Sequence, residues 1–412
     1  MNPFRYGKEV SGYQFYDRTE NFDQLYRTLK DGSTNVVLYA PRRYGKTSLV
    51  LKVQEKFKAE GIKCIHFDIS KINSIERFCA EYTAAVYALW GGLPEIVSRI
   101  KEYLVHLHPT ISFSEGLLPE ITFDYGERMS ALAVSEVLDL PEKLAERAGD
   151  ASVVVAFDEF QDVAGLSKDI PLEATFRSVI QAHRRVRYAF LGSKTHLMSR
   201  MFGAKSRPFY KSALALKIGK PPVEESVEFL TSRFAGEGME IPADVVSRLL
   251  ELSENIPYFL QAMAALSYQS AENRRATRIE QGDLDAAVRL FMDGNEDYYE
   301  EVLRNLAEAQ YSLTEALARE PVARFDESYR NRHRLGSLST LHSAIRGLLR
   351  RGVIDVIKGT YVMADPFFAR FVRERSHAPV QLLRIDRRAG LRRGRLGGQA
   401  APRLPGRTEG PR

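Results

Sequence analysis

One segment constrains this chain more than any other: the loop at residues 40–47, which directly follows a short apolar run. The apolar run, residues 36–39, predicts a buried strand, and the spacing of apolar residues after the loop predicts an amphipathic helix. A glycine-containing loop between a strand and a helix directs several backbone N–H groups to one point, where a phosphate group can bind. At its end, Lys46 can reach the β- and γ-phosphates of a nucleotide and Thr47 can coordinate Mg²⁺.

The residues of this segment that we expect to contact nucleotide are Ala40, Pro41, Arg42, Arg43, Tyr44, Gly45, Lys46, Thr47 and Ser48. Gly45 permits close approach of the backbone to a phosphate, whereas Ala40 occupies the first position of the pattern, which is usually glycine. The two arginines have three interpretations: they contact phosphate, a partner carboxylate or water.

A second apolar run, Val153–Phe157, ends directly at Asp158 and Glu159. A carboxylate at the tip of a parallel strand lies beside the phosphate loop, so Asp158 is predicted to support Mg²⁺ together with Thr47. The glutamate that follows is predicted to activate the attacking water. An apolar run that ends in Asp-Glu is common. It becomes strong evidence for a nucleotide site only in combination with Lys46 of the loop.

Two further catalytic candidates are Ser193 and Arg207. Ser193 ends the next predicted strand, where it can contact the γ-phosphate or the water; the alternative is a turn residue. Arg207 follows that strand by one helix and can act on the nucleotide of a neighbouring molecule; the alternative is an ordinary surface arginine.

Apolar runs at residues 62–68, 153–157 and 188–192 alternate with helical patterns, and the last run ends just before Ser193. Such alternation predicts an α/β fold, in which helices cover both faces of a parallel sheet. Beyond residue 222 only helical patterns follow, and near the end a hairpin with Lys358-Gly359 at its turn suggests a winged helix. The predicted units are a phosphate-loop domain (1–222), a helical lid (223–296), a winged helix (297–375) and a basic tail (376–412).

The net charge of +6 comes from the tail, because residues 376–412 contain nine arginines and two acidic residues. This tail is rich in Gly, Pro and Arg and is predicted to be disordered. No apolar run is long enough to cross a membrane, and no secretory signal is recognisable. The two cysteines, Cys64 and Cys79, have no metal-ligand or redox spacing. These features predict a cytoplasmic protein.

Several motifs resemble the P-loop ATPases of the AAA/STAND group, especially the archaeal-type ATPase family. They are Asn2-Pro3-Phe4, Phe15-Tyr16-Asp17-Arg18, the segment from Tyr39 to Leu49, Phe157-Asp158-Glu159-Phe160-Gln161, Gly192-Ser193, Asn255-Ile256-Pro257-Tyr258 and Asp365-Pro366-Phe367-Phe368. The resemblance implies a five-stranded parallel sheet, a helical lid and a C-terminal winged helix. It further implies that Asp17 and Arg18 lie near the adenine and that Pro257 lies where the lid closes over the nucleotide. This chain departs from the family in the lid, where residues 255–269 contain no arginine.

The sequence therefore predicts a Mg²⁺-dependent ATPase that binds ATP and acts as a switch. ATP is favoured because no guanine-reading Asn-Lys-x-Asp is present. Double-stranded DNA is one candidate partner, through the tail and through His342, Arg346, Arg350 and Arg351 of the winged helix. A protein partner is the other, and oligomerisation is compatible with both. The alternative function is a signalling or scaffold protein latched by nucleotide, with little turnover.

Overall fold

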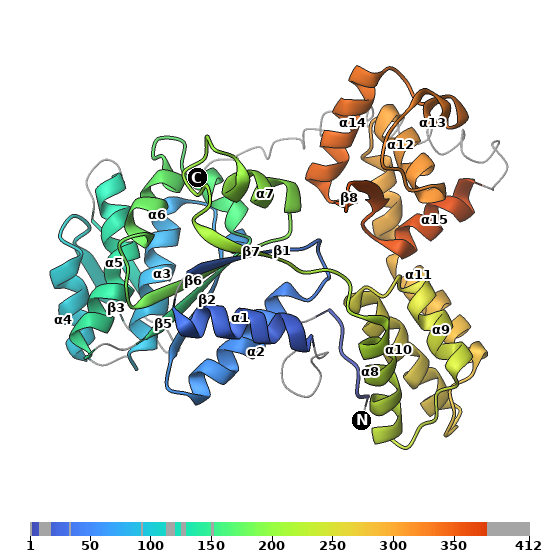
Figure 1. The fold of residues 1–412 in the computed structure, drawn as a ribbon, viewed down its shortest axis with the longest axis horizontal. Helices are drawn as coiled ribbons and strands as arrows, with labels where there is room; N and C mark the ends of the chain where they lie inside the picture. Colours follow the sequence, from blue (N-terminus) through green and yellow to red (C-terminus); the bar gives the residue numbers. More distant parts are fainter. Residues whose placement is uncertain are drawn as a thin grey trace, which may run out of the picture.

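The computed structural model of the chain describes residues 2–7, 18–32, 34–91, 94–112, 120–124, 129–149 and 152–376. Its centre is a five-stranded parallel sheet with the order β2-β5-β6-β1-β7 (Figure 1). The strands are β1 (Asn35–Tyr39), β2 (Lys63–Asp68), β5 (Val153–Asp158), β6 (Val186–Gly192) and β7 (Ala213–Lys217). The predicted α/β fold with a parallel sheet is confirmed.

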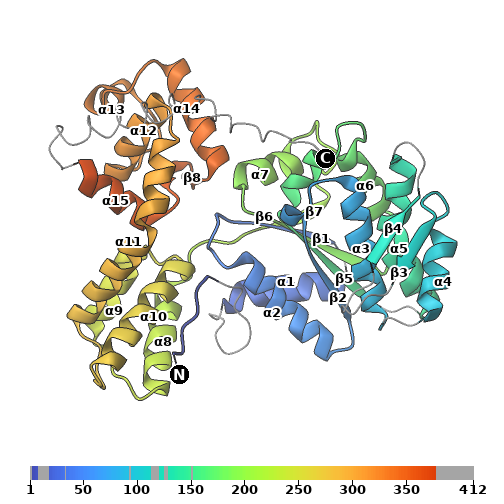
Figure 2. The same cartoon turned by 180° about the vertical axis from the view of Figure 1, so that it is seen from behind.

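Successive residues of each strand point to opposite faces of the sheet, and both faces are buried. On β1, Val36 and Leu38 pack in one core and Val37 packs in the other. The first face is covered by α1 (Thr19–Asp31) and α2 (Lys46–Ala59), as Figures 1 and 2 show from the two sides. The helices of the opposite side are α3 (Ile75–Leu89), α4 (Pro94–Tyr103), α5 (Ala131–Arg147), α6 (Leu172–Ile180) and α7 (Thr195–Gly203). The strands β3 (Pro109–Ser112) and β4 (Glu120–Phe123) form a small antiparallel hairpin beside α3.

The aromatic residue Phe157 lies at the centre of the second core and is fully buried. Its neighbours within 6.4 Å between ring centroids are Phe67, Phe78, Tyr82, Phe160, Phe176, Tyr188 and Phe190. Replacing Phe157 by alanine is expected to lower the free energy of unfolding by about 3–5 kcal/mol, because the cavity cannot close. Urea denaturation followed by circular dichroism measures this decrease. The matched control is Leu132→Ala on the exposed side of α5, and equal decreases in the two variants would contradict this packing.

Four helices follow the sheet domain: α8 (Val223–Gly236), α9 (Ala243–Leu252), α10 (Pro257–Asn273) and α11 (Gln281–Arg304). The N-terminal segment joins this lid, because Phe4 is buried against the rings of Phe229 and Phe234. The last lid helix continues across residue 296, the predicted limit of the lid, and leads directly into the next domain.

The final domain contains α12 (Glu308–Arg319), α13 (Glu327–Arg332), α14 (Leu338–Arg351), β8 (Ile354–Ile357), β9 (Thr360–Met363) and α15 (Pro366–Ser376). Its two strands form the predicted hairpin, with Lys358 and Gly359 both at positive φ in the turn. Such a turn matches the twist of the two strands. The rings of Phe259, Phe291 and Phe367 join this domain to the lid in one apolar core. Among the described residues, no helix has both the length and the apolar character needed to cross a membrane.

Candidate active site

The predicted site lies at the carboxyl ends of three adjacent strands, β5, β6 and β1. The phosphate loop (residues 40–45) follows β1, Asp158 is the last residue of β5, and Ser193 follows β6. Parallel strands end at a common edge, which is where α/β proteins bind their ligands. The strand order therefore brings together side chains that are far apart in the sequence.

Two residues of the phosphate loop adopt left-handed backbone conformations, Arg43 with a φ of 72° and Gly45 with a φ of 79°. Helix α2 begins directly after Gly45, and the first backbone N–H groups of a helix lack partners within it. These N–H groups and the positive end of the helix dipole favour an anion at the loop. Ala40 is buried and is not among the described residues with positive φ, so alanine causes no strain at this position.

Lys46 is the first residue of α2 and is 6% exposed. Burial lowers the pKa of this lysine below its ordinary value, while the charges of Glu159 and Asp158 act in the opposite direction. An ammonium group that has given up most of its water is stabilised by any anion that binds next to it. The position of Lys46 therefore suits a ligand with several negative charges.

Thr47 and Asp158 contact each other, because the Thr47 hydroxyl donates to Asp158 Oδ2 over 2.6 Å. His66 of β2 approaches the same oxygen, with its Nε2 atom 3.4 Å away. Burial alone would raise the Asp158 pKa, but His66, Thr47 and the charge of Lys46 hold it below its ordinary value. An ionised carboxylate and a hydroxyl are oxygen ligands of the kind that Mg²⁺ takes beside nucleotide phosphates, so these residues fit that ion.

Glu159 has a φ of 49°, an uncommon and strained conformation for a residue with a side chain. Its Oε2 atom accepts hydrogen bonds from Gln161 Nε2 (2.5 Å), Ser193 Oγ (2.7 Å) and the backbone N–H of Ser193 (3.2 Å). The structure therefore places Ser193 against the carboxylate of Glu159. The side chains of Gln161 and Ser193 together hold the Glu159 carboxylate beside the end of β6.

Gln161 and His66 received no site role from the sequence, although both contact the predicted carboxylates. Gln161 lies so close to Gly192 that a Cβ added to this glycine would clash with Gln161 Oε1. Only glycine allows this approach. In the sequence, His66 could have been noticed as a polar residue near the end of a buried strand. The glycine before Ser193 could have indicated that another side chain, here Gln161, packs closely at this point.

Arg18 is buried and connects the phosphate loop to the segment that leads from β7 into the lid. Its guanidinium donates to the backbone oxygens of Tyr44 and Gly219, each over 2.8 Å. Pro257 is the first residue of α10, and the N–H of the next residue, Tyr258, donates to the backbone oxygen of Arg43 over 3.4 Å. Both sequence candidates therefore lie at the loop.

Asp17 and the tail beyond Ser376, which the sequence also singles out, lie outside the described residues. Asn255, which precedes helix α10 of the lid, has a φ of 54°, and asparagine tolerates this conformation. Arg207 donates to Glu173 of α6 and is not in contact with the carboxylates of the site.

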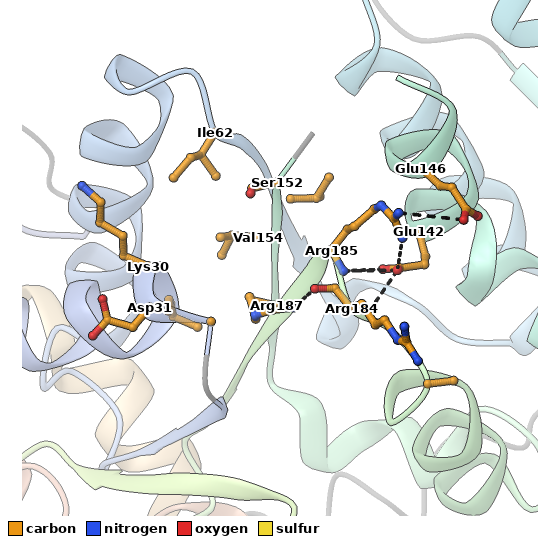
Figure 3. A pocket seen from close by; sticks show the side chains of 14 residues that line it. Lys30, Asp31, Ile62, Glu142, Glu146, Ser152, Val154, Arg184, Arg185 and Arg187 are labelled. Carbon is orange, nitrogen blue, oxygen red and sulfur yellow. Dashed lines mark hydrogen bonds and ion pairs between the residues drawn. The ribbon is translucent and has the colours of Figure 1, made fainter. Parts of the chain in front are cut away.

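A cavity of about 600 Å³ lies at the other end of the sheet, at the amino ends of β5 and β6 (Figure 3). Glu142 accepts hydrogen bonds there from the backbone N–H groups of Arg184, Arg185 and Val186, over 2.9–3.1 Å. Arg185 also pairs with Glu142 and, at 3.8 Å, with Glu146. These charges neutralise one another, and the cavity is remote from the phosphate loop, so we assign the site to the carboxyl ends.

The fold is similar to that of a Walker-type ATPase of Pyrococcus abyssi, with 19% sequence identity and a TM-score of 0.63. That match covers 90% of this chain and 99% of the other. The ORC2 protein of Aeropyrum pernix, in ADPNP–ADP complexes, is similar with 13% identity and a TM-score of 0.52, over 89% of this chain and 96% of that one. At such identities the similarity shows the fold alone. A comparison with curated proteins found no match.

The parallel sheet, the phosphate loop and the neighbouring Asp-Glu pair define a P-loop ATPase. Residues 15–228 match a family described as an ATPase domain predominantly from Archaea, and residues 297–374 match a probable winged helix domain. The first match covers more than half of the 412 residues, so the chain belongs to that ATPase family. The resemblance to the archaeal-type ATPase family with a C-terminal winged helix is thereby confirmed.

Proposed function

We propose that this ATPase is a switch of the AAA/STAND type, which binds ATP with Mg²⁺, hydrolyses it and changes the position of its winged helix. The observation that carries the proposal is the meeting of Lys46, Thr47, Asp158 and Glu159 at one edge of the sheet. Positive charge, a hydroxyl and two carboxylates are the groups that phosphoryl transfer to water requires.

In this proposal each side chain has one role. Lys46 and the loop N–H groups bind the β- and γ-phosphates, and Thr47 and Asp158 hold Mg²⁺. Glu159 orients and activates the attacking water. Ser193, which already contacts Glu159, links the state of this carboxylate to the γ-phosphate. Arg18 and Pro257 bound the space for the adenosine part.

Arg207 acts on the nucleotide of a neighbouring molecule only if it leaves Glu173. Burial raises the pKa of Glu173, while the charge of Arg207 acts against this shift. Opening the pair would leave the mostly buried Glu173 carboxylate without its cation, so the contacts made in an assembly would have to offset that cost. The two free, buried cysteines are compatible with a reducing compartment such as the cytoplasm.

We further propose that the winged helix engages double-stranded DNA through α14. On this helix His342, Arg346 and Arg350 are all exposed and recur at every fourth position, so they form one basic stripe. Arginines on such a helix can contact phosphates or base edges in the major groove. The basic residues before the helix contribute less, because Arg332 and His333 both pair with Glu320 at 3.1 Å.

Replacing Arg346 and Arg350 together by alanine is expected to weaken binding to duplex DNA about tenfold or more at moderate salt. The slope of log affinity against log salt concentration should fall by about one for each phosphate that the variant no longer neutralises. Fluorescence anisotropy with a labelled duplex at several salt concentrations measures both. Arg332→Ala is the matched control, since its guanidinium is already paired with Glu320. Equal affinity in the double variant and the control would exclude this stripe as the DNA site.

A second function is favoured by two contacts of Glu159: the side chains of Ser193 and Gln161 both donate hydrogen bonds to its Oε2 atom, which is then less able to accept a proton from water. A chain fixed in this state would be a nucleotide-latched scaffold with slow turnover and a protein-binding winged helix. Hydrolysis of ATP with Mg²⁺, measured with and without duplex DNA, separates the two. A rate that DNA raises supports the DNA-coupled switch, and tight ATP binding with slow, DNA-insensitive turnover supports the latch.

A further inference from the structure

The phosphate loop is in contact with both the lid and the winged helix through a single side chain. Arg43 Nη1 lies 2.5 Å from Asp365 Oδ2, at the start of α15. The guanidinium also lies over the rings of Tyr258 (4.9 Å) and Phe259 (4.8 Å) of the lid. Of the three interpretations of this arginine from sequence, the structure shows contact with a carboxylate, and this carboxylate belongs to the same chain.

Asp365 is itself held firmly within the winged helix. Its Oδ1 atom accepts hydrogen bonds from the backbone N–H groups of Phe367 (2.9 Å) and Phe368 (3.0 Å), while the Tyr299 hydroxyl donates to Oδ2 over 3.4 Å. The ion pair with Arg43 therefore links the loop to a rigid part of the winged helix. A movement of either partner is transmitted to the other.

A second carboxylate of the winged helix, Asp355 on β8, faces the phosphate loop. A cavity of about 150 Å³ separates the hairpin from the loop and lid, and Asp355, Tyr44, Lys220 and Glu254 are among its lining residues. The charges of Lys46 and Arg42 both act on the Asp355 carboxyl. The hairpin thus places a carboxylate within the electrostatic reach of the lysine that is expected to bind phosphate.

The Asp355 carboxylate is poorly compensated in this position. Burial raises its pKa to about 7, and Lys46 and Arg42 reverse only part of that shift. Among the described residues, none donates a hydrogen bond to it. Asp355 is only partly exposed, and a charged group that loses part of its water without gaining hydrogen bonds opposes the contact that covers it. Docking of the hairpin on the loop is therefore a contact that a further negative charge can disrupt.

We propose that Asp355 couples the occupancy of the phosphate loop to the position of the winged helix, because nucleotide phosphates and this carboxylate compete for Lys46 and Arg42. This inference rests on the proposed binding of ATP at the loop. Bound phosphates repel Asp355, the hairpin leaves the loop, and the Arg43–Asp365 ion pair opens with it. By reciprocity, a partner that holds the hairpin on the loop weakens nucleotide binding by the same factor.

The test measures release of the winged helix directly in the full-length chain. Cysteines introduced at Arg27 on α1 and Ser343 on α14, both exposed, carry spin labels, while Cys64 and Cys79 are buried. The distance between the labels is recorded with and without a non-hydrolysable ATP analogue and Mg²⁺. The variants are Asp355→Asn and, as the matched control on exposed α13, Glu327→Gln. Binding of a fluorescent form of the analogue is measured in parallel.

We expect the analogue to shift the label distance in the labelled parent and in Glu327→Gln. In Asp355→Asn the analogue still binds, but the released fraction at equal occupancy is about fivefold smaller, because the repulsion is gone. Equal release in Asp355→Asn, or binding without any shift in the parent, would overturn the inference and leave nucleotide binding intact. Failure of the analogue to bind to the parent chain would overturn the proposed function, and the inference with it.

Discussion

Replacement of Lys46 by alanine is expected to weaken ATP binding at least about 100-fold, which corresponds to about 3 kcal/mol. The reason is that Lys46 is the buried cation of the phosphate loop, and its burial already lowers its pKa. Without the ammonium group, the phosphates would lose their buried cation while the carboxylates of Asp158 and Glu159 remain close by. Titration with a fluorescent ATP analogue measures the change in affinity.

Lys58→Ala is the matched control for this experiment. Lys58 lies on the same helix, near its far end, and its side chain is exposed. This variant should bind ATP as the wild type does. Unchanged affinity in Lys46→Ala would mean that nucleotide binds elsewhere or does not use the loop, and the assignment of the site would be wrong.

The second large effect is expected for Glu159→Gln, which should retain ATP binding while its rate of hydrolysis falls about 10²–10⁴-fold. Glutamine has the same shape, and its carbonyl oxygen can accept the hydrogen bonds from Ser193. It cannot take a proton from water, so the chemical step is removed while the fold of the site is kept. Single-turnover hydrolysis of radiolabelled ATP measures the step itself.

Asp162→Asn serves as the control for removal of a nearby carboxylate. Asp162 lies three residues further on and pairs with Lys194 at 2.8 Å, outside the phosphate site. Its rate should stay close to that of the wild type. A Glu159→Gln variant with the same rate as this control would remove Glu159 from the mechanism.

The sheet was predictable where its strands are buried on both faces. Such strands read as continuous apolar runs, as in Val153–Phe157. The edge strand β7 was not identified from its own sequence, because three of its five residues are exposed and the run Ala-Leu-Ala-Leu-Lys also fits a helix. The helices α1 and α5 and the hairpin β3–β4 also went unpredicted. The strands among these elements are short, and short strands take their structure from the surfaces on which they pack.

The site was predictable to the extent that its residues adjoin strands. Asp158 follows an apolar run directly, and Lys46 ends the loop that follows another, so the position of each could be inferred from the edge of a parallel sheet. Contacts that depend on the tertiary arrangement could not be inferred. Gln161 reaches Glu159 through the turn after β5, and Asp355 comes from a domain far along the chain. Nothing in local sequence specifies which loop the winged helix would face.

The measurement that tests the central claim most directly is phosphate release from ATP by the purified wild-type chain, in Mg²⁺ and in excess EDTA. Because we propose that Thr47 and Asp158, which contact each other, hold the ion, we predict release that requires Mg²⁺ and disappears in EDTA. Release at the same rate in both conditions, or none above the buffer rate in Mg²⁺, would contradict this claim.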